Sequence, residues 1–297
     1  MSNGVSALPE SHYPLLRWGN WLLALAGLIV VYVPTFVDLS RGAWQSDENV
    51  HGPMVLLVAL YLFWLKRDII LAERRGNLLL GLALLVPGLL LYIVGRSQAI
   101  LILEIGSQLP VLAGIVLALG GTAALRATAF PIAFLIFMVP LPGFLVDAVT
   151  GPLKQHVSVW ADAILYALGY PISRAGVILT IGQYQLLVAD ACSGLHSMFT
   201  LSALGILYLY LVERQGWLHN AFVAACILPI AFFANVTRVI VLVLVTYHFG
   251  DEAGQGFIHG FAGMLLFIVA LCLLFVVDAA VLRATATVSG KRRQVKS

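Results

Sequence analysis

Residues 77–95 read NLLLGLALLVPGLLLYIVG, a stretch of nineteen residues without a charged side chain. A helix of that length is about 28 Å long, which matches the roughly 30 Å hydrocarbon core of a lipid bilayer. Similar runs recur along the 297-residue chain, which is 61% hydrophobic and only 10% charged. Soluble domains carry about 25% charged residues, and their helices need a polar face that most of these runs lack. The sequence therefore predicts an all-α polytopic membrane protein with about eight transmembrane helices.

Seven further segments have the apolar character of a span, although the second span is short and the seventh is longer than an upright helix needs. The seventh is expected to tilt, or to emerge from the membrane in its last turns. The first is expected to be a retained span, because no basic region precedes it as in a signal peptide. The expected spans are 15–36, 52–66, 77–95, 99–119, 121–141, 194–213, 217–247 and 258–282.

The distribution of Lys and Arg gives the orientation of these spans. If the N-terminus is cytoplasmic, most of the 17 basic residues fall in cytoplasmic segments, as the positive-inside rule requires. Both termini are therefore placed in the cytoplasm, together with the basic tail 284–297. The longest stretch between spans, 142–193, then lies on the outer face. The whole chain, 1–297, is treated as one integral membrane domain.

The outer stretch is expected to contain an amphipathic helix followed by a short β-hairpin. Apolar residues recur there at three- and four-residue spacing with polar residues mostly opposite, which is typical of a helix lying in the membrane interface. A break is expected near Gly151-Pro152. The β-prone runs GVILTI and YQLLVA flank Gly182-Gln183 and predict the hairpin. The predicted apolar face comprises Phe144, Leu145, Val149, Leu153, Val157, Trp160, Ile164 and Leu168.

Cys192 is a candidate nucleophile. It lies in ADACSGLHSMFTLSALG, residues 189–205, where the hairpin is expected to end and a helix to begin. The dipole of that helix favours the thiolate form of a cysteine at its N-terminus. The backbone N–H groups of Ser193 and Gly194 could surround an oxyanion next to the sulfur. The alternative is a small thiol that packs like any apolar residue.

Arg238 is the second candidate. In ANVTRVIVLVLVTYHFG, residues 234–250, Asn235 and Arg238 are three residues apart and share one face of the seventh span. Arginine keeps its proton, so within a span it needs a carboxylate, an anion or a carbonyl as acceptor. Snorkelling to the interface is the alternative. However, nine residues separate Arg238 from His248, about two and a half turns, which favours a functional role.

His259 is the third candidate. It opens the last span in GQGFIHGFAGMLLF, residues 254–267, beside glycines that allow neighbouring helices to approach closely. A neutral imidazole can act as a general base near pH 7, although an interfacial histidine bonded to water is the simpler interpretation of one residue alone. A cysteine, an arginine and a histidine on three helices at one membrane face together supply a nucleophile, an anion clamp and a base.

Four other polar residues compete for supporting roles on the outer side. His196, four residues after the cysteine, is an alternative base, and Asp190 could orient an imidazole. His51, at the outer start of the second span, could line the same cavity. Glu104, in the fourth span, could pair with Arg238. Sequence alone leaves these alternatives open.

No cofactor and no metal ion are expected. The three cysteines, Cys192, Cys226 and Cys272, are far apart and have no CxxC spacing. The last two lie in apolar runs and are interpreted as packed thiols. Nucleic acid is not an expected partner, because the basic residues lie in short loops rather than on one face. Membrane lipid surrounds the chain, and its oligomeric state stays open.

In these motifs the chain resembles the exosortases, membrane cysteine transpeptidases with the archaeosortases as relatives, and it is most similar to the exosortase B subgroup. The resemblance extends from about residue 15 to residue 283, and the motifs follow the family's order. They are ACSG at Cys192, N-x-x-R at Asn235 and Arg238, HG at His259, an upstream HG at His51, and PLP at 140–142.

The resemblance implies a cysteine protease or transpeptidase of the bacterial inner membrane with its active site on the periplasmic side. Its partners would be exported proteins that carry a Pro-Glu-Pro motif, a C-terminal transmembrane helix and a basic end. The family is associated with exopolysaccharide production. By resemblance Cys192 is the nucleophile, and Arg238 and His259 complete the catalytic set.

Two other classes of protein remain as alternatives. A transporter is disfavoured because the halves of the chain do not repeat and the charges gather at one face rather than at the midplane. A membrane acyltransferase that uses His259 would leave Cys192 and Arg238 without a role.

Overall fold

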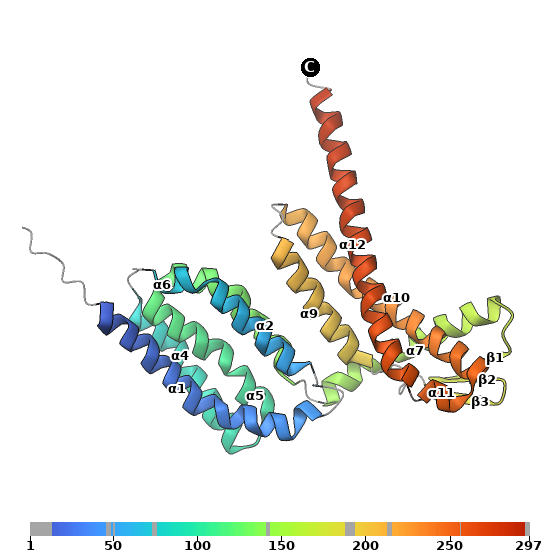
Figure 1. The fold of residues 1–297 in the computed structure, drawn as a ribbon, viewed down its shortest axis with the longest axis horizontal. Coiled ribbons are helices and arrows are strands. Elements are labelled where there is room, and N and C mark those ends of the chain that lie inside the picture. The colour runs from blue at the N-terminus through green and yellow to red at the C-terminus, as the bar shows by residue number, and fades with distance from the viewer. Residues whose placement is uncertain are drawn as a thin grey trace, which may run out of the picture. The chain divides into compact units, whose positions relative to one another are not determined.

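The computed structural model describes the backbone of residues 14–45, 49, 51–72, 76–140, 143–187, 194–212, 216–255 and 257–294 (Figure 1). The chain divides into two compact units. The first comprises residues 1–46 and 52–139, and the second comprises residues 47–51 and 140–297.

The first unit is helical. Its central pair, α4 and α6, lie side by side, with the short helix α5 also packed on α4 (Figure 1). The elements are α1 (Pro14–Arg41), the 3-10 turn η1 (Ala43–Gln45), α2 (Gly52–Leu65), α3 (Arg67–Ile70), α4 (Leu78–Ser97), α5 (Leu101–Gly106), α6 (Gln108–Phe134) and the 3-10 turn η2 (Leu135–Met138).

A row of glycines lets α4 and α6 approach closely. Gly81, Gly88 and Gly95 are buried and recur every seven residues along α4. A Cβ atom added to Gly81 would lie 2.7 Å from the main chain of Ala118, and one added to Gly88 would lie 3.0 Å from the nitrogen of Val111. Since no side chain fits in that space, the two backbones are in direct contact, as in other small-residue helix pairs of membranes.

The boundary predicted between the fourth and fifth spans is present as a kink. Helical hydrogen bonding runs from Gln108 to Phe134, but Gly121 has φ +75° and ψ −174°, which is not helical backbone. Residues 101–138 together form one apolar stretch that could cross a membrane. The other stretches of sufficient length and hydropathy among the described residues are 19–45, 78–97 and 219–249, with shorter apolar helices at 52–65 and 200–212. The polytopic membrane fold is therefore confirmed, and the count of eight spans stays a prediction.

The second unit is built around the long helix α10 (Trp217–Phe249). Its first half shares an apolar core with two other helices, to which Leu201, Ala231 and Leu274 belong. Its second half shares another core with α7 and the sheet, to which Val157, Leu179 and Val239 belong. The other elements are α7 (Gly143–Ala167), β1 (Ile172–Ala175), β2 (Ile178–Ile181), β3 (Tyr184–Leu187), α9 (Gly194–Val212), α11 (Asp251–Gln255) and α12 (Phe257–Gln294).

The predicted β-hairpin is confirmed, and it is part of a larger sheet. β2 and β3 pair antiparallel with Ile181 opposite Tyr184, and Gly182 takes φ +56° in the turn between them. A third strand, β1, pairs antiparallel with β2 and places Ile172 opposite Ile181. A two-stranded hairpin alone is marginally stable, so the extra strand and the packing on α10 stabilise it.

The amphipathic helix differs from its prediction in two respects. Its backbone is helical throughout Gly143–Ala167, so Gly151-Pro152 does not end it. Its buried side is formed by Val157, Ala161 and Leu165, each fully buried, whereas three residues of the predicted apolar face, Trp160, Ile164 and Leu168, are exposed by 46%, 36% and 65%. The helix therefore has two apolar sides, and both reach α10, because the half-exposed Trp160 ring lies edge-to-face against Phe232 and Phe233 of that helix.

Candidate active site

Asn235 and Arg238 lie on α10 with exposed fractions of only 1% and 4%. In the same helix, Ile227, Ala231 and Ala234 belong to the core shared with α9 and α12. Arg238 follows Ala234 by one turn and Asn235 follows Ala231 by one turn, so both continue that stripe. Because a guanidinium stays charged when buried, the position of Arg238 inside the unit is chemically demanding.

A buried polar cluster at the other end of these helices shows how they run. The Nε2 atom of His219, at the start of α10, lies 2.6 Å from Oδ1 of Asp278 in α12. The hydroxyl of Tyr208, near the end of α9, donates to Oδ2 of the same aspartate at 2.9 Å. Hence α9 and α12 run in one direction and α10 runs in the opposite one.

This cluster was not among the sites predicted from the sequence, although the sequence contains an indication of it. Asp278 lies within FVVDAAVL, and an acidic residue inside an apolar span usually faces a polar partner. Its exposed fraction is 3%, and that of His219 is 9%.

Residues of α9, α10 and α12 pack together at one point, which we call the Gly205 layer and use as a common reference along the three helices. Gly205 of α9, Ile227 of α10 and Ala270 of α12 line the same small hollow between the helices. A Cβ atom added to Gly205 would lie 2.8 Å from the Ile227 side chain. These two helices are therefore in close contact at this height.

Eleven residues from this layer, away from the His219–Asp278 end, α9 reaches its first residue Gly194, α10 reaches Arg238 and α12 reaches His259. At 1.5 Å per residue, each position lies about 16 Å from the layer. The start of α9, the start of α12 and the buried arginine are thus equally far along their own helices from the layer, on the side away from the His219–Asp278 end. An active site assembled from these three helices is geometrically consistent with that arrangement.

Parts of the predicted site lie outside what the structure describes. Cys192 and Ser193 precede the first described residue of α9, and Asp190 lies in the same gap. The backbones of His196 and His259 belong to α9 and α12, whereas their side chains are outside the described set. The roles assigned to these residues from sequence stay predictions.

The two remaining candidates have described side chains. His51 is 9% exposed and groups with the second unit, which also contains Arg238. Glu104 belongs to the first unit and is 3% exposed. Its Oε1 accepts a hydrogen bond from Oγ1 of Thr35 at 2.6 Å and from the guanidinium of Arg96 at 3.0 Å.

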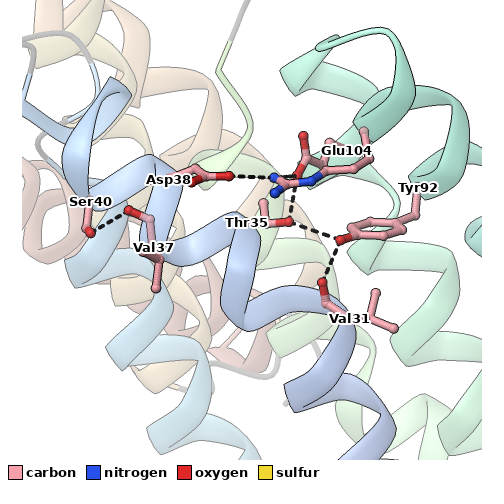
Figure 2. Close-up of polar contacts among 8 residues, drawn as sticks. Val31, Thr35, Val37, Asp38, Ser40, Tyr92 and Glu104 are labelled. Atoms are coloured by element: carbon pink, nitrogen blue, oxygen red, sulfur yellow. Dashed lines mark hydrogen bonds and ion pairs between the residues drawn. The ribbon is translucent and has the colours of Figure 1, made fainter.

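The Glu104 contacts belong to a network that ties α1 to α4 and α5 (Figure 2). Arg96 also pairs with Asp38 at 2.7 Å, and the hydroxyl of Tyr92 donates to the carbonyl of Val31 at 2.6 Å. Glu104 therefore holds the helices of the first unit together at the predicted outer side. Pairing of Glu104 with Arg238 stays a hypothesis.

Asp278→Asn is expected to lower the stability of the protein by about 3 kcal/mol, because it replaces the charged acceptor of two hydrogen bonds in a buried cluster. We would measure the thermal unfolding midpoint in nanodiscs. The matched control is Asp68→Asn, whose side chain is 84% exposed and which should leave the midpoint unchanged. Equal midpoints for both variants would contradict a stabilising role for the Asp278 cluster.

A scan against protein-family models finds a match to the transmembrane exosortase model over residues 43–276. The chain belongs to the transmembrane exosortase family. The match crosses both units and includes the segments of Cys192, Arg238 and His259, so the family inferred from the motifs is confirmed. Membership of the exosortases indicates a membrane protease or transpeptidase in general terms. Comparisons with curated proteins and with solved structures found no match.

Proposed function

We propose that this exosortase cleaves the C-terminal sorting signal of exported proteins at the periplasmic face of the bacterial inner membrane, with Cys192 as nucleophile. The observation that supports this most is that Arg238 and the starts of α9 and α12 each lie about 16 Å along their own helices from the Gly205 layer, on the same side of it. A guanidinium in this position can donate hydrogen bonds to a peptide carbonyl as that carbonyl becomes an oxyanion.

In the proposed reaction the Cys192 thiolate attacks a peptide carbonyl near a Pro-Glu-Pro motif of the substrate. Arg238, with the N–H groups of Ser193 and Gly194, stabilises the oxyanion. His259 takes the thiol proton and transfers it to the leaving amine as the C–N bond breaks. The resulting thioester is then released by water, or by an amine acceptor in transpeptidation.

Several residues would support this chemistry without reacting. Asn235 shares the buried face of Arg238 and would position its guanidinium. His51, which groups with the same unit, would line the cavity, and His196 is the alternative base. Glu104 would act by fixing the helices of the first unit. A substrate helix would reach the site laterally from the bilayer, with both termini of the enzyme in the cytoplasm.

The test is co-expression of the full chain with an exported reporter that ends in a Pro-Glu-Pro motif, a membrane helix and a basic tail. The expected result is a shortened reporter whose new C-terminus, read by mass spectrometry, lies at the motif. A matched reporter with Ala-Ala-Ala in place of Pro-Glu-Pro should stay intact. Both reporters remaining intact, with the enzyme present in the membrane and several motif variants tried, would contradict the proposal and favour a transporter or an acyltransferase.

A further inference from the structure

The first unit contains an elongated apolar cavity of about 370 Å³ between α1, α2 and α6. Along α1 its lining runs from Trp21 to Phe36, and from the other helices it includes Ala59, Leu112 and Val116. Fifteen residues of helix correspond to about 22 Å, so the cavity follows α1 for much of the bilayer thickness. Its volume is within the range of about 300–1,000 Å³ that ligand pockets occupy.

The shape of this cavity suits a linear hydrocarbon chain. A helix about 22 Å long and about 10 Å across occupies about 1,700 Å³, several times the cavity volume of about 370 Å³. An α-helix with its side chains is about 10 Å across, so a protein helix does not fit inside. A single extended acyl chain does.

The cavity is open to the exterior of the protein along α1. Leu25, Ile29 and Val33 line it and are also exposed by 52%, 51% and 45%. These residues lie within 19–45, one of the stretches able to cross a membrane. In a bilayer the exposed side of such a helix meets lipid, which is therefore the most concentrated ligand at the opening.

One polar group interrupts the apolar lining. The side chain of Gln108 lines the cavity, is 4% exposed, and its Nε2 atom has no hydrogen-bond partner among the described residues. A buried amide donor without an acceptor is unfavourable, so a ligand that supplies an acceptor is favoured. The neighbouring hydroxyl of Tyr32 is already bonded to Ser107 at 2.8 Å.

The depth of Gln108 below the predicted outer boundary of the membrane indicates which hydrogen-bond acceptor of a ligand would lie beside it. It lies four residues, about 6 Å, further along the chain than Glu104, whose partner Arg96 is 41% exposed and marks the predicted outer boundary. The ester carbonyls of a glycerolipid lie just below its headgroup, at the boundary between polar and apolar layers. We propose that this cavity binds one acyl chain of a membrane glycerolipid and that the lipid's ester carbonyl accepts a hydrogen bond from Nε2 of Gln108.

The test uses the full chain in nanodiscs that contain phosphatidylcholine with a photoactivatable diazirine in one acyl chain. After illumination, labelled peptides are mapped by mass spectrometry as the mole fraction of the probe increases. Labelling of the cavity-lining segments of α1 and α6 should saturate, because it reports a site. Labelling around Leu79, which is 82% exposed on α4, should increase in proportion to the probe, because it reports bulk lipid.

Two variants distinguish labelling at the cavity from labelling by bulk lipid. Ala24→Trp places a large side chain in the cavity and should remove the saturable labelling while leaving that around Leu79 unchanged. Gln108→Leu should weaken the saturable labelling about fivefold, the effect of losing one hydrogen bond. The matched control Gln98→Leu, at an exposed glutamine, should change neither.

Cavity labelling that increases linearly with the probe and is insensitive to Ala24→Trp and to Gln108→Leu would overturn the proposal. Saturable labelling that a single-helix peptide displaces, and that unlabelled phosphatidylcholine does not, would also overturn it and assign the cavity to a protein helix. If Ala24→Trp does not accumulate in the membrane, Gln108→Leu alone still decides, because an unchanged saturation curve for that variant contradicts the carbonyl contact.

Discussion

Cys192→Ala is expected to abolish cleavage of the Pro-Glu-Pro reporter, a loss of at least about 10³-fold, while the protein still accumulates in the membrane. The substitution removes the sulfur that would form the thioester, and no other group in the proposed mechanism replaces it. We would measure the fraction of shortened reporter on a gel, together with the amount of enzyme in the membrane.

The matched control is the double variant Cys226→Ala and Cys272→Ala. Both of these cysteines lie in helices of the second unit, Cys226 partly buried and Cys272 exposed. They are assigned no chemical role, so the double variant should cleave as the wild type does. Cleavage by Cys192→Ala would show that the nucleophile is a different residue, even if the family assignment holds.

Arg238→Ala is expected to reduce reporter cleavage by about 10²- to 10³-fold, which is the usual effect of removing one oxyanion donor. Arg238→Lys should retain part of the activity, because lysine keeps the charge but not the planar, two-pronged donor geometry. The measurement is the initial rate of reporter cleavage at equal enzyme levels.

A structural role of Arg238 has to be separated from a catalytic one. Its exposed fraction is 4%, so the thermal unfolding midpoint of each variant must be measured alongside its activity. Labelling of Cys192 by a small alkylating reagent should persist in Arg238→Ala if only the oxyanion contact is lost. Arg174→Ala, at an exposed arginine of β1, is the control and should cleave normally. Normal cleavage by a stable Arg238→Ala protein would refute its role.

Hydropathy predicted the membrane class and most helix positions, because in a bilayer the length of an apolar run nearly determines its structure. The β2–β3 turn at Gly182 was also predictable, since it depends on local backbone preferences. The family followed from five short motifs in a fixed order. These features share one property, which is that neighbouring residues in the chain decide them.

Features that depend on distant residues were not predictable in this way. Which side of α7 is buried depends on α10, so Ala161 is fully buried while the larger Trp160 is 46% exposed. The hydrogen bond between Asp278 and His219 joins residues 59 apart in the sequence. Helical periodicity contains no information about either partner.

The long helix α10 forms one wall of both apolar cores of the second unit, the core with α9 and α12 and the core with α7 and the sheet. Arg238 lies where the two halves of this wall meet. Because the same helix supports both cores, loss of either core would release the backbone that holds the other. The second unit is therefore expected to unfold cooperatively, so that proteolytic removal of α7 and the sheet would also loosen the bundle of α9, α10 and α12.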